Sequence, residues 1–208
     1  MTNKYAIVVD MHRCIGCWSC SVACKLENNL PDQAWWNTIL TVGGESAHTP
    51  AGEYGSNTLS YMPLNCHHCD VPSCVEVCPS GATYKDEETG IVMQDTEVCI
   101  GCRSCMSACP YTGVRTFIDG NPQSVLDWPV GNKKAQPHLE NTVEKCTLCY
   151  YRVTDGDIPA CVEGCPARAR YFGDLNDSNS EISKLLAERE YTQMLPEEGT
   201  GPNIYYIS

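Results

Sequence analysis

The stretch Cys99-Ile-Gly-Cys102-Arg-Ser-Cys105-Met-Ser-Ala-Cys109-Pro110 carries four cysteines in the spacing C-x2-C-x2-C-x3-C, with a proline after the last one. The same spacing occurs near the N-terminus in Cys14-Ile-Gly-Cys17-Trp-Ser-Cys20-Ser-Val-Ala-Cys24. Two further groups have wider gaps, and they consist of Cys66, Cys69, Cys74 and Cys78, and of Cys146, Cys149, Cys161 and Cys165. These four groups use all 16 cysteines of the 208-residue chain.

A cysteine content this high has three common explanations: disulfides, zinc sites or iron–sulfur clusters. A disulfide framework gives no reason for repeated C-x2-C spacing. Zinc sites use pairs of C-x2-C separated by a longer spacer, which only the fourth group resembles. The first and third groups have the spacing of bacterial ferredoxins, in which three thiolates hold one 4Fe–4S cluster and the fourth reaches a different cluster. The spacing therefore favours iron–sulfur clusters.

Composition points the same way. Only 42% of the residues are hydrophobic, a class that includes the cysteines, and the chain has two phenylalanines. Clusters would have to replace part of the missing apolar core. The net charge of −12 argues against a nucleic-acid-binding surface and against direct docking on anionic lipid. No apolar run approaches the roughly 20 residues of a membrane helix, and the first residues lack the pattern of a signal peptide.

The chain contains a copy of itself. Residues 10–24 align with residues 95–109, and residues 71–84 align with residues 158–171. The period is much longer than the roughly 20–50 residues of a solenoid unit, so it indicates a duplicated module.

Each two-cluster module needs two groups that exchange their last cysteine. Between the second and third groups, residues 81–84 and 91–93 predict two strands joined by a turn, a compact hairpin. The 42 residues from Cys24 to Cys66 are too long for such a hairpin and contain Gly43-Gly44 and other loop signals. The second group is therefore paired with the third, and the first with the fourth. The predicted ligand sets are set a (Cys14, Cys17, Cys20 and Cys165), set b (Cys146, Cys149, Cys161 and Cys24), set c (Cys66, Cys69, Cys74 and Cys109) and set d (Cys99, Cys102, Cys105 and Cys78).

The predicted fold class is α+β, with two ferredoxin-like two-cluster modules related by the internal repeat. Residues 1–30 and 144–180 form the outer module, residues 61–111 form the inner module, and residues 31–60 and 112–143 are loop insertions. Residues 181–208 are expected to form a helix capped by Ser180 and a docking tail. The apolar end of the tail, residues 204–207, could lie on this chain or on a partner. We expect both insertions and the tail after Leu195 to supply most of the contact with partners.

Other residues carry weaker signals. His67 and His68 lie between two cysteines, where a hydrogen bond that tunes a cluster is a better interpretation than a ligand role. His12, His48 and His138 lack metal-type spacing and are interpreted as surface or loop residues. Trp18 and Arg103 occupy the same position of the repeat, where each could border a cluster or simply lie at the surface. No catalytic constellation stands out, so the chain is expected to be non-catalytic.

The four groups together resemble a known family. The order of the groups, with C-I-G-C in the first and third, C-H-H-C in the second and C-T-L-C followed by C-P in the fourth, is similar to the iron–sulfur electron-transfer subunits of the dimethyl sulfoxide reductase family of molybdopterin oxidoreductases. Glu27-Asn28 and Gly199-Thr-Gly-Pro202 resemble the arsenate, polysulfide and dimethyl sulfoxide reductase branch.

This resemblance implies four 4Fe–4S clusters, because the third group keeps all four cysteines. It also implies a molybdenum or tungsten catalytic subunit as one partner, and commonly a quinol-oxidising membrane subunit as another, in an anaerobic respiratory reductase. The expected location is the periplasmic face of the membrane, reached by co-export with the catalytic subunit, with the cytoplasm as the other compartment left open. The alternative functions are a polyferredoxin subunit of a cytoplasmic formate dehydrogenase or hydrogenase complex, and a zinc- or disulfide-stapled structural protein.

Overall fold

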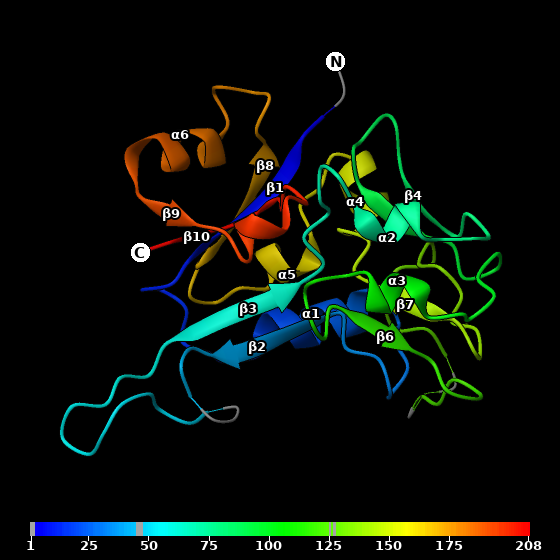
Figure 1. Cartoon of the computed structure of the whole chain (residues 1–208), viewed down its shortest axis with the longest axis horizontal. Coiled ribbons are helices and arrows are strands. Elements are labelled where there is room, and N and C mark those ends of the chain that lie inside the picture. Colours follow the sequence, from blue (N-terminus) through cyan, green and yellow to red (C-terminus); the bar gives the residue numbers. More distant parts are fainter. Residues whose placement is uncertain (1–2, 45–47, 125, 127) are drawn as a thin grey trace.

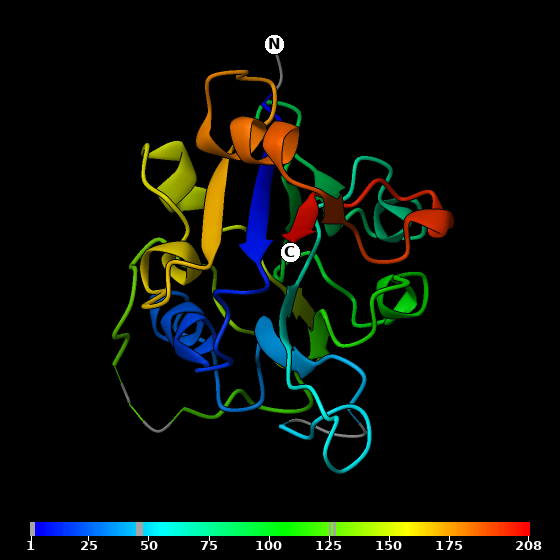
Figure 2. The ribbon, with the colours of Figure 1, turned by 90° about the vertical axis from the view of Figure 1, so that its left-hand side faces the viewer.

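The structure, a computed structural model, describes residues 3–44, 48–124, 126 and 128–208. Its largest element is a four-stranded mixed sheet in the order β8-β1-β10-β9. Strand β1 (Tyr5–Asp10) pairs antiparallel with β8 (Arg170–Asp174) and parallel with β10 (Ile204–Ile207), which also pairs with β9 (Tyr191–Thr192). Figures 1 and 2 show this sheet at one end of the molecule, with α6 (Glu181–Glu188) lying over it.

Alternation along the strands divides the sheet into two apolar faces. Ala6, Val8 and Ile207 pack with Ile182 of α6. Ile7 and Val9 point to the opposite face, where they meet side chains from the rest of the chain. The sheet is therefore buried on both sides, and its inner face forms the wall of the cysteine-rich interior.

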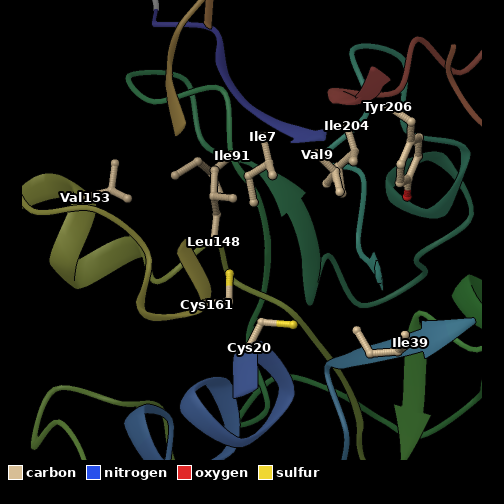
Figure 3. Close-up of a cluster of buried hydrophobic side chains, with 10 residues drawn as sticks. All are labelled: Ile7, Val9, Cys20, Ile39, Ile91, Leu148, Val153, Cys161, Ile204 and Tyr206. Atoms are coloured by element: carbon tan, nitrogen blue, oxygen red, sulfur yellow. The ribbon is translucent and has the colours of Figure 1, made fainter. Parts of the chain in front are cut away.

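The inner face of the sheet and the cysteine-bearing segments share one core, drawn in Figure 3. The sulfurs of Cys20 and Cys161 lie at its lower edge in that view. The full set of buried residues in this cluster is Ile7, Val9, Cys20, Ile39, Ile91, Leu148, Val153, Cys161, Ile204 and Tyr206. Cysteine side chains are thus part of the core rather than attached to its surface.

The remaining elements are short. Three antiparallel pairs are β2 (Asn37–Thr41) with β3 (Tyr61–Asn65), β4 (Thr83–Lys85) with β5 (Val92–Gln94), and β6 (Arg115–Phe117) with β7 (Val143–Lys145). The helices besides α6 are α1 (Ser19–Glu27), α2 (Ser73–Glu76), α3 (Ser104–Ser107), α4 (Tyr150–Thr154) and α5 (Ala160–Glu163), and a 3-10 turn, η1, covers Pro196–Glu198. Helix α1 packs against α5, and α2 packs against α3. In the described part of the chain, no helix is long and apolar enough to cross a membrane.

The sequence repeat has a counterpart in the strand pairing. In the β4–β5 pair, Tyr84 lies opposite Met93. In the β8–β1 pair, the equivalent residues Tyr171 and Val8 lie opposite each other in the same way. The strands that flank the second and third groups pair with one another, and so do those that flank the first and fourth.

Two expectations about the segments between the groups need correction. Residues 31–60 and 112–143 were expected to be loop insertions, but each contains strand residues that close a hairpin, β2 with β3 and β6 with β7. The separation from Cys24 to Cys66 does not prevent strands β2 and β3 from forming a hairpin, because the extra residues form a long loop between the two strands. The described part of that loop extends away from the body in Figure 1.

The C-terminal segment also differs from the expectation of a docking tail. The predicted helix is confirmed, with the Ser180 hydroxyl accepting a hydrogen bond from the Ser183 N–H at 3.2 Å. The docking prediction is wrong for residues 204–207, because they form strand β10 and are buried in this chain's own sheet. The four apolar or aromatic side chains Ile204-Tyr-Tyr-Ile207 provide the reason, since both faces of the sheet are covered.

Candidate iron–sulfur cluster sites

All sixteen cysteines are free thiols. Two of the predicted sets line cavities directly. Cys24 of α1 joins Cys146, Cys149 and Cys161 around one cavity. The four cysteines of set a line a second cavity, although Cys165 is separated from Cys14 by about three-quarters of the chain.

The other two sets are recognised by the electrostatic influence that each thiol has on its neighbours. Burial, together with the neighbouring thiolates of Cys66, Cys74 and Cys109, raises the pKa of Cys69 to about 11. Burial likewise raises the pKa of Cys109 to about 11, again with Cys66 and Cys74 adding to the effect. The structure therefore brings the four cysteines of set c together.

In set d, the electrostatic neighbours are two pairs, Cys102 with Cys78 and Cys105 with Cys99. Hydrogen bonds from Ser104 lower the pKa of Cys102, while the thiolate of Cys78 opposes that shift. Burial raises the pKa of Cys105, and Cys99 is among the thiolates that add to it. In every set, one cysteine comes from a different group from the other three.

Local backbone geometry explains why the Cys-Ile-Gly-Cys turns have this sequence. Gly16 and Gly101 have φ angles of +66° and +68°, a region that side chains disfavour. A Cβ on Gly16 would lie 2.5 Å from the Tyr61 ring, and one on Gly101 would overlap the carbonyl oxygen of Asn141. Glycine is therefore required twice over, by conformation and by space.

Backbone N–H groups point at several of the sulfurs. Thr83 N–H donates to Cys78 Sγ and Ala169 N–H donates to Cys165 Sγ, both at 3.3 Å. The two cysteines are equivalent in the repeat, but the donors differ by one position, because Ala169 corresponds to Ala82. N–H donors favour the thiolate form and hold the sulfurs of cluster sites.

Buried polar atoms without partners test whether a cluster fits these sites. Trp36 Nε1 and Asn37 Nδ2 belong to residues that line the set b cavity, and Arg170 Nε belongs to one that lines the set a cavity. Within the described residues, none of these three donors has a hydrogen-bond partner. An unpaired buried donor is costly, and the sulfurs of a bound cluster would accept from them. The residues present therefore fit 4Fe–4S clusters.

The geometry does not fit a single metal ion. Across the described ranges, no three His, Cys, Asp or Glu side chains are arranged to hold one ion. A zinc site needs four ligands at about 2.0–2.3 Å from one centre. The cysteines instead surround volumes, as ligands at the corners of a larger body would.

Electrostatic neighbours in different sets indicate the order of the sets. Cys20 of set a lies near Cys161 of set b, Cys146 of set b near Cys66 of set c, and Cys74 of set c near Cys105 of set d. All four cysteines of set b are buried, whereas Cys17 of set a and Cys102 of set d are exposed. The four sets follow one another as a, b, c, d, with an exposed cysteine at each end.

The histidines fall into two classes. His67 is stacked on Tyr111 with ring centroids 4.1 Å apart, and burial lowers its pKa to about 3. In the described structure, all four ring nitrogens of His67 and His68 lack partners. His12 and His48 are exposed, as predicted.

His138 lies in a loop, as predicted, but it is half-buried and paired. Its Nδ1 lies 2.8 Å from a carboxylate oxygen of Glu144, and its Nε2 lies 2.9 Å from the carbonyl oxygen of Asn28. Both neighbours are acceptors, so the imidazolium form satisfies them best. No spacing in the sequence could have indicated this contact, because its partners come from distant segments.

The two residues at the equivalent repeat position behave differently. Trp18 donates from Nε1 to His48 at 3.2 Å and meets Trp35 edge to face. Arg103 lies over the Phe117 ring, 3.6 Å from its centroid. Both share a left-handed φ of about +61° to +62°, so the two copies of the repeat share backbone geometry here rather than side-chain chemistry.

Comparison with known proteins agrees with these sites. A family model described as a 4Fe-4S dicluster domain matches residues 57–122 and 129–175, and a second model with the same description matches residues 13–82. A Halobacterium salinarum protein described as an iron–sulfur subunit of dimethyl sulfoxide reductase is 47% identical, over 100% of this chain and 80% of its own. The chain belongs to the iron–sulfur electron-transfer subunits of the dimethyl sulfoxide reductase family.

Other members of this family have varied names. The iron–sulfur subunit of the arsenate respiratory reductase of a Shewanella species is 36% identical, over 98% of this chain and 96% of its own. A subunit of the tetrathionate reductase of Salmonella typhimurium is 38% identical, over 99% of this chain and 72% of its own. These relatives do not favour the formate dehydrogenase or hydrogenase alternative.

Proposed function

We propose that this chain carries four 4Fe–4S clusters, one in each of sets a to d, and conducts electrons along the series a, b, c, d. The observation that carries the proposal is the order of the sets. Each set neighbours the next, the interior set b is fully buried, and an exposed cysteine lies at each end. When bound, the clusters supply reversible one-electron transfer.

The residues of the chain have three tasks in this function. The thiolates hold the clusters, with one cysteine of each set arriving from a different group and so tying two segments together. Backbone N–H groups such as those of Thr83 and Ala169 stabilise the ligand sulfurs. The apolar face of β1 and the core in Figure 3 keep water from the interior sets.

The same arrangement supports the division into modules. Sets a and b draw on residues 1–30 and 144–180, where α1 packs on α5, and sets c and d draw on residues 61–111, where α2 packs on α3. The internal repeat thus relates two ferredoxin-like modules, joined where Cys146 lies near Cys66.

The proposed partners are a molybdopterin catalytic subunit at one end of the series and a quinol-oxidising membrane subunit at the other. The chain itself would be non-catalytic. This is supported by the reductase names of relatives, and by a relative named the iron–sulfur cluster-binding subunit of a menaquinone reductase, which is 35% identical. The proposed location is peripheral to the cytoplasmic membrane, on its outer face.

Chemical analysis of anaerobically purified protein tests the cluster count. Four clusters predict about sixteen iron and about sixteen sulfide per chain. Zinc in place of iron, or about eight iron, would contradict the proposal.

Exchange of the last cysteine can be tested separately. Cys109→Ser should alter the cluster of set c and leave set d intact, although Cys109 belongs to the third group. Cys105→Ser is the matched control and should alter set d instead. If both variants alter the same paramagnetic signal, the proposed exchange of ligands is wrong.

A further inference from the structure

Three cationic side chains are buried in the described structure: Lys145, Arg170 and Arg115, with exposed fractions of 0%, 4% and 6%. Buried charges are normally paired, because an uncompensated charge in the interior is strongly destabilising. Among the described residues, none of the three has a carboxylate oxygen within 4.0 Å. Their counter-charge must come from another source.

The buried carboxylates are already paired elsewhere. Asp10 binds Arg189 at 2.7 Å, and Glu144 binds His138 at 2.8 Å. The absence of carboxylates beside the three buried cations of the described chain is therefore a feature of those positions and not of the whole interior.

Arg170 lies between sets a and b. Cys161 of set b and Cys20 of set a are its strongest electrostatic neighbours. Two of its N–H groups donate to the side-chain oxygens of Asn37 and Asn65 at 3.2 and 2.7 Å. These neutral acceptors fix the guanidinium without cancelling its charge.

Arg115 has the equivalent position between sets c and d. Its strongest electrostatic neighbours are Cys74 and Cys66 of set c, followed by Cys105 of set d. Gln94 accepts from its Nη1 at 3.1 Å, while Nη2 has no partner among the described residues. As at Arg170, a neutral amide orients the cation and one N–H remains for an acceptor that the protein does not supply.

Lys145 lies between sets b and c, where the two modules meet. Its ammonium donates to the carbonyl oxygens of Val92 and of Cys146, the latter at 2.9 Å. Its charged neighbours are Cys66 and Cys74 of set c, Cys146 of set b, and the like-charged Arg115. The lysine directly precedes a set b ligand in sequence and faces set c in space.

We propose that Arg170, Lys145 and Arg115 are positioning residues, one at each of the three junctions between neighbouring cluster sites, whose charges raise the reduction potentials of both flanking clusters. The inference rests on the proposed four-cluster function. Reduction adds a negative charge to a cluster, so a cation nearby stabilises the reduced state, and burial makes the interaction stronger than it would be in water. A cation shared by two clusters acts on both, so removing its charge should lower both potentials together.

Redox titration of the full chain, followed by electron paramagnetic resonance, tests this. The variants are Arg170→Met, Lys145→Met and Arg115→Met, each of which removes the charge from a long side chain. Each should lower the potentials of two of the four signals by at least the equivalent of a tenfold change in equilibrium constant, which is 59 mV for one electron. Lys184→Met, an exposed lysine of α6, is the control and should move none.

The pattern of overlap needs no prior assignment of signals. Lys145→Met should share one shifted signal with Arg170→Met and a different one with Arg115→Met, whereas the two arginine variants should share none. Equal shifts of all four signals, no shift, or any other overlap would overturn the proposal. Fewer than four clusters in the unmodified protein would instead refute the proposed function.

If a neutral variant assembles less iron, charge-retaining variants distinguish an effect of the lost charge from an effect of the changed side-chain shape. Lys145→Arg and Arg115→Lys should keep the iron content and the potentials of the unmodified protein. Loss of the same clusters in Lys145→Arg as in Lys145→Met would show that the site requires the shape of the lysine, and would overturn the electrostatic role.

Discussion

Strand β10 gives the sharpest test of how the C-terminal segment is used. Ile207 is completely buried between Ala6, Val8 and Ile182, so Ile207→Ala removes three buried carbons and leaves a cavity. Such a substitution costs about 2 to 5 kcal/mol. At roughly 2–4 °C per kcal/mol for a chain of this size, the thermal midpoint should fall by at least about 4 °C.

The control is the same substitution at Ile100, whose side chain is 66% exposed in the third cysteine group. Ile100→Ala should change stability by no more than about 0.5 kcal/mol. Both variants are to be compared under anaerobic conditions by circular dichroism and by the visible absorbance of the clusters. Equal midpoints for the two variants, with Ile207→Ala losing only its association with a partner, would refute the intramolecular role of β10 and restore the docking interpretation.

Three further predictions concern the cluster loops, pH and metal removal. Gly101→Ala should destabilise the fold by more than the roughly 1–2 kcal/mol of a left-handed residue, and it should weaken the set d signal. Gly113→Ala is also at positive φ but has nothing within 4 Å of the new Cβ, so it should cost only that roughly 1–2 kcal/mol. Equal losses of stability would contradict the close approach of Asn141 to Gly101. Burial lowers the pKa of His138 and Lys25 opposes its charging, but the hydrogen bond to Glu144 raises the pKa above the ordinary value overall. The contribution of the charged His138 to the free energy of unfolding, about 1–2 kcal/mol, should therefore be complete below about pH 6.5 and lost as pH rises through the folded pKa. Melting of His138→Gln and of the unmodified protein at several pH values checks this, and a difference that grows with pH would contradict it. Chelation of the iron should abolish the cooperative thermal transition, because assembly and folding of such sites are coupled, and an intact transition in the chelated chain would contradict that coupling.

The cysteine spacing predicted the class of site because ligand geometry is local. A loop with three cysteines two residues apart can surround one cluster whatever the rest of the chain does. The exchange of last cysteines gave the four ligand sets proposed here, and it stays a prediction until the clusters are located. The repeat then indicated which strands correspond, as the registers at Tyr84 and Tyr171 show.

The parts that the sequence left open depend on contacts between distant segments. Strand β10 is only four residues long, and its place between β1 and β9 follows from burial on both faces rather than from any local signal. The paired strands at the ends of the two expected insertions have too few residues to show a clear alternation. Arg170 and Arg115 stand in no motif, and Lys145 looks like one more lysine beside a cysteine until the fold brings Cys66 to it.

The central claim is that each of four clusters is held by three cysteines of one group and the last cysteine of another. Anomalous diffraction at the iron edge, from crystals of anaerobically purified protein, tests it most directly because it locates the iron atoms beside named sulfurs. We expect four cubane-shaped peaks in the order a, b, c, d, with Cys24 bound beside Cys146, Cys149 and Cys161. A map in which Cys24 binds beside Cys66, Cys69 and Cys74, or in which fewer than four clusters are present, would contradict the claim.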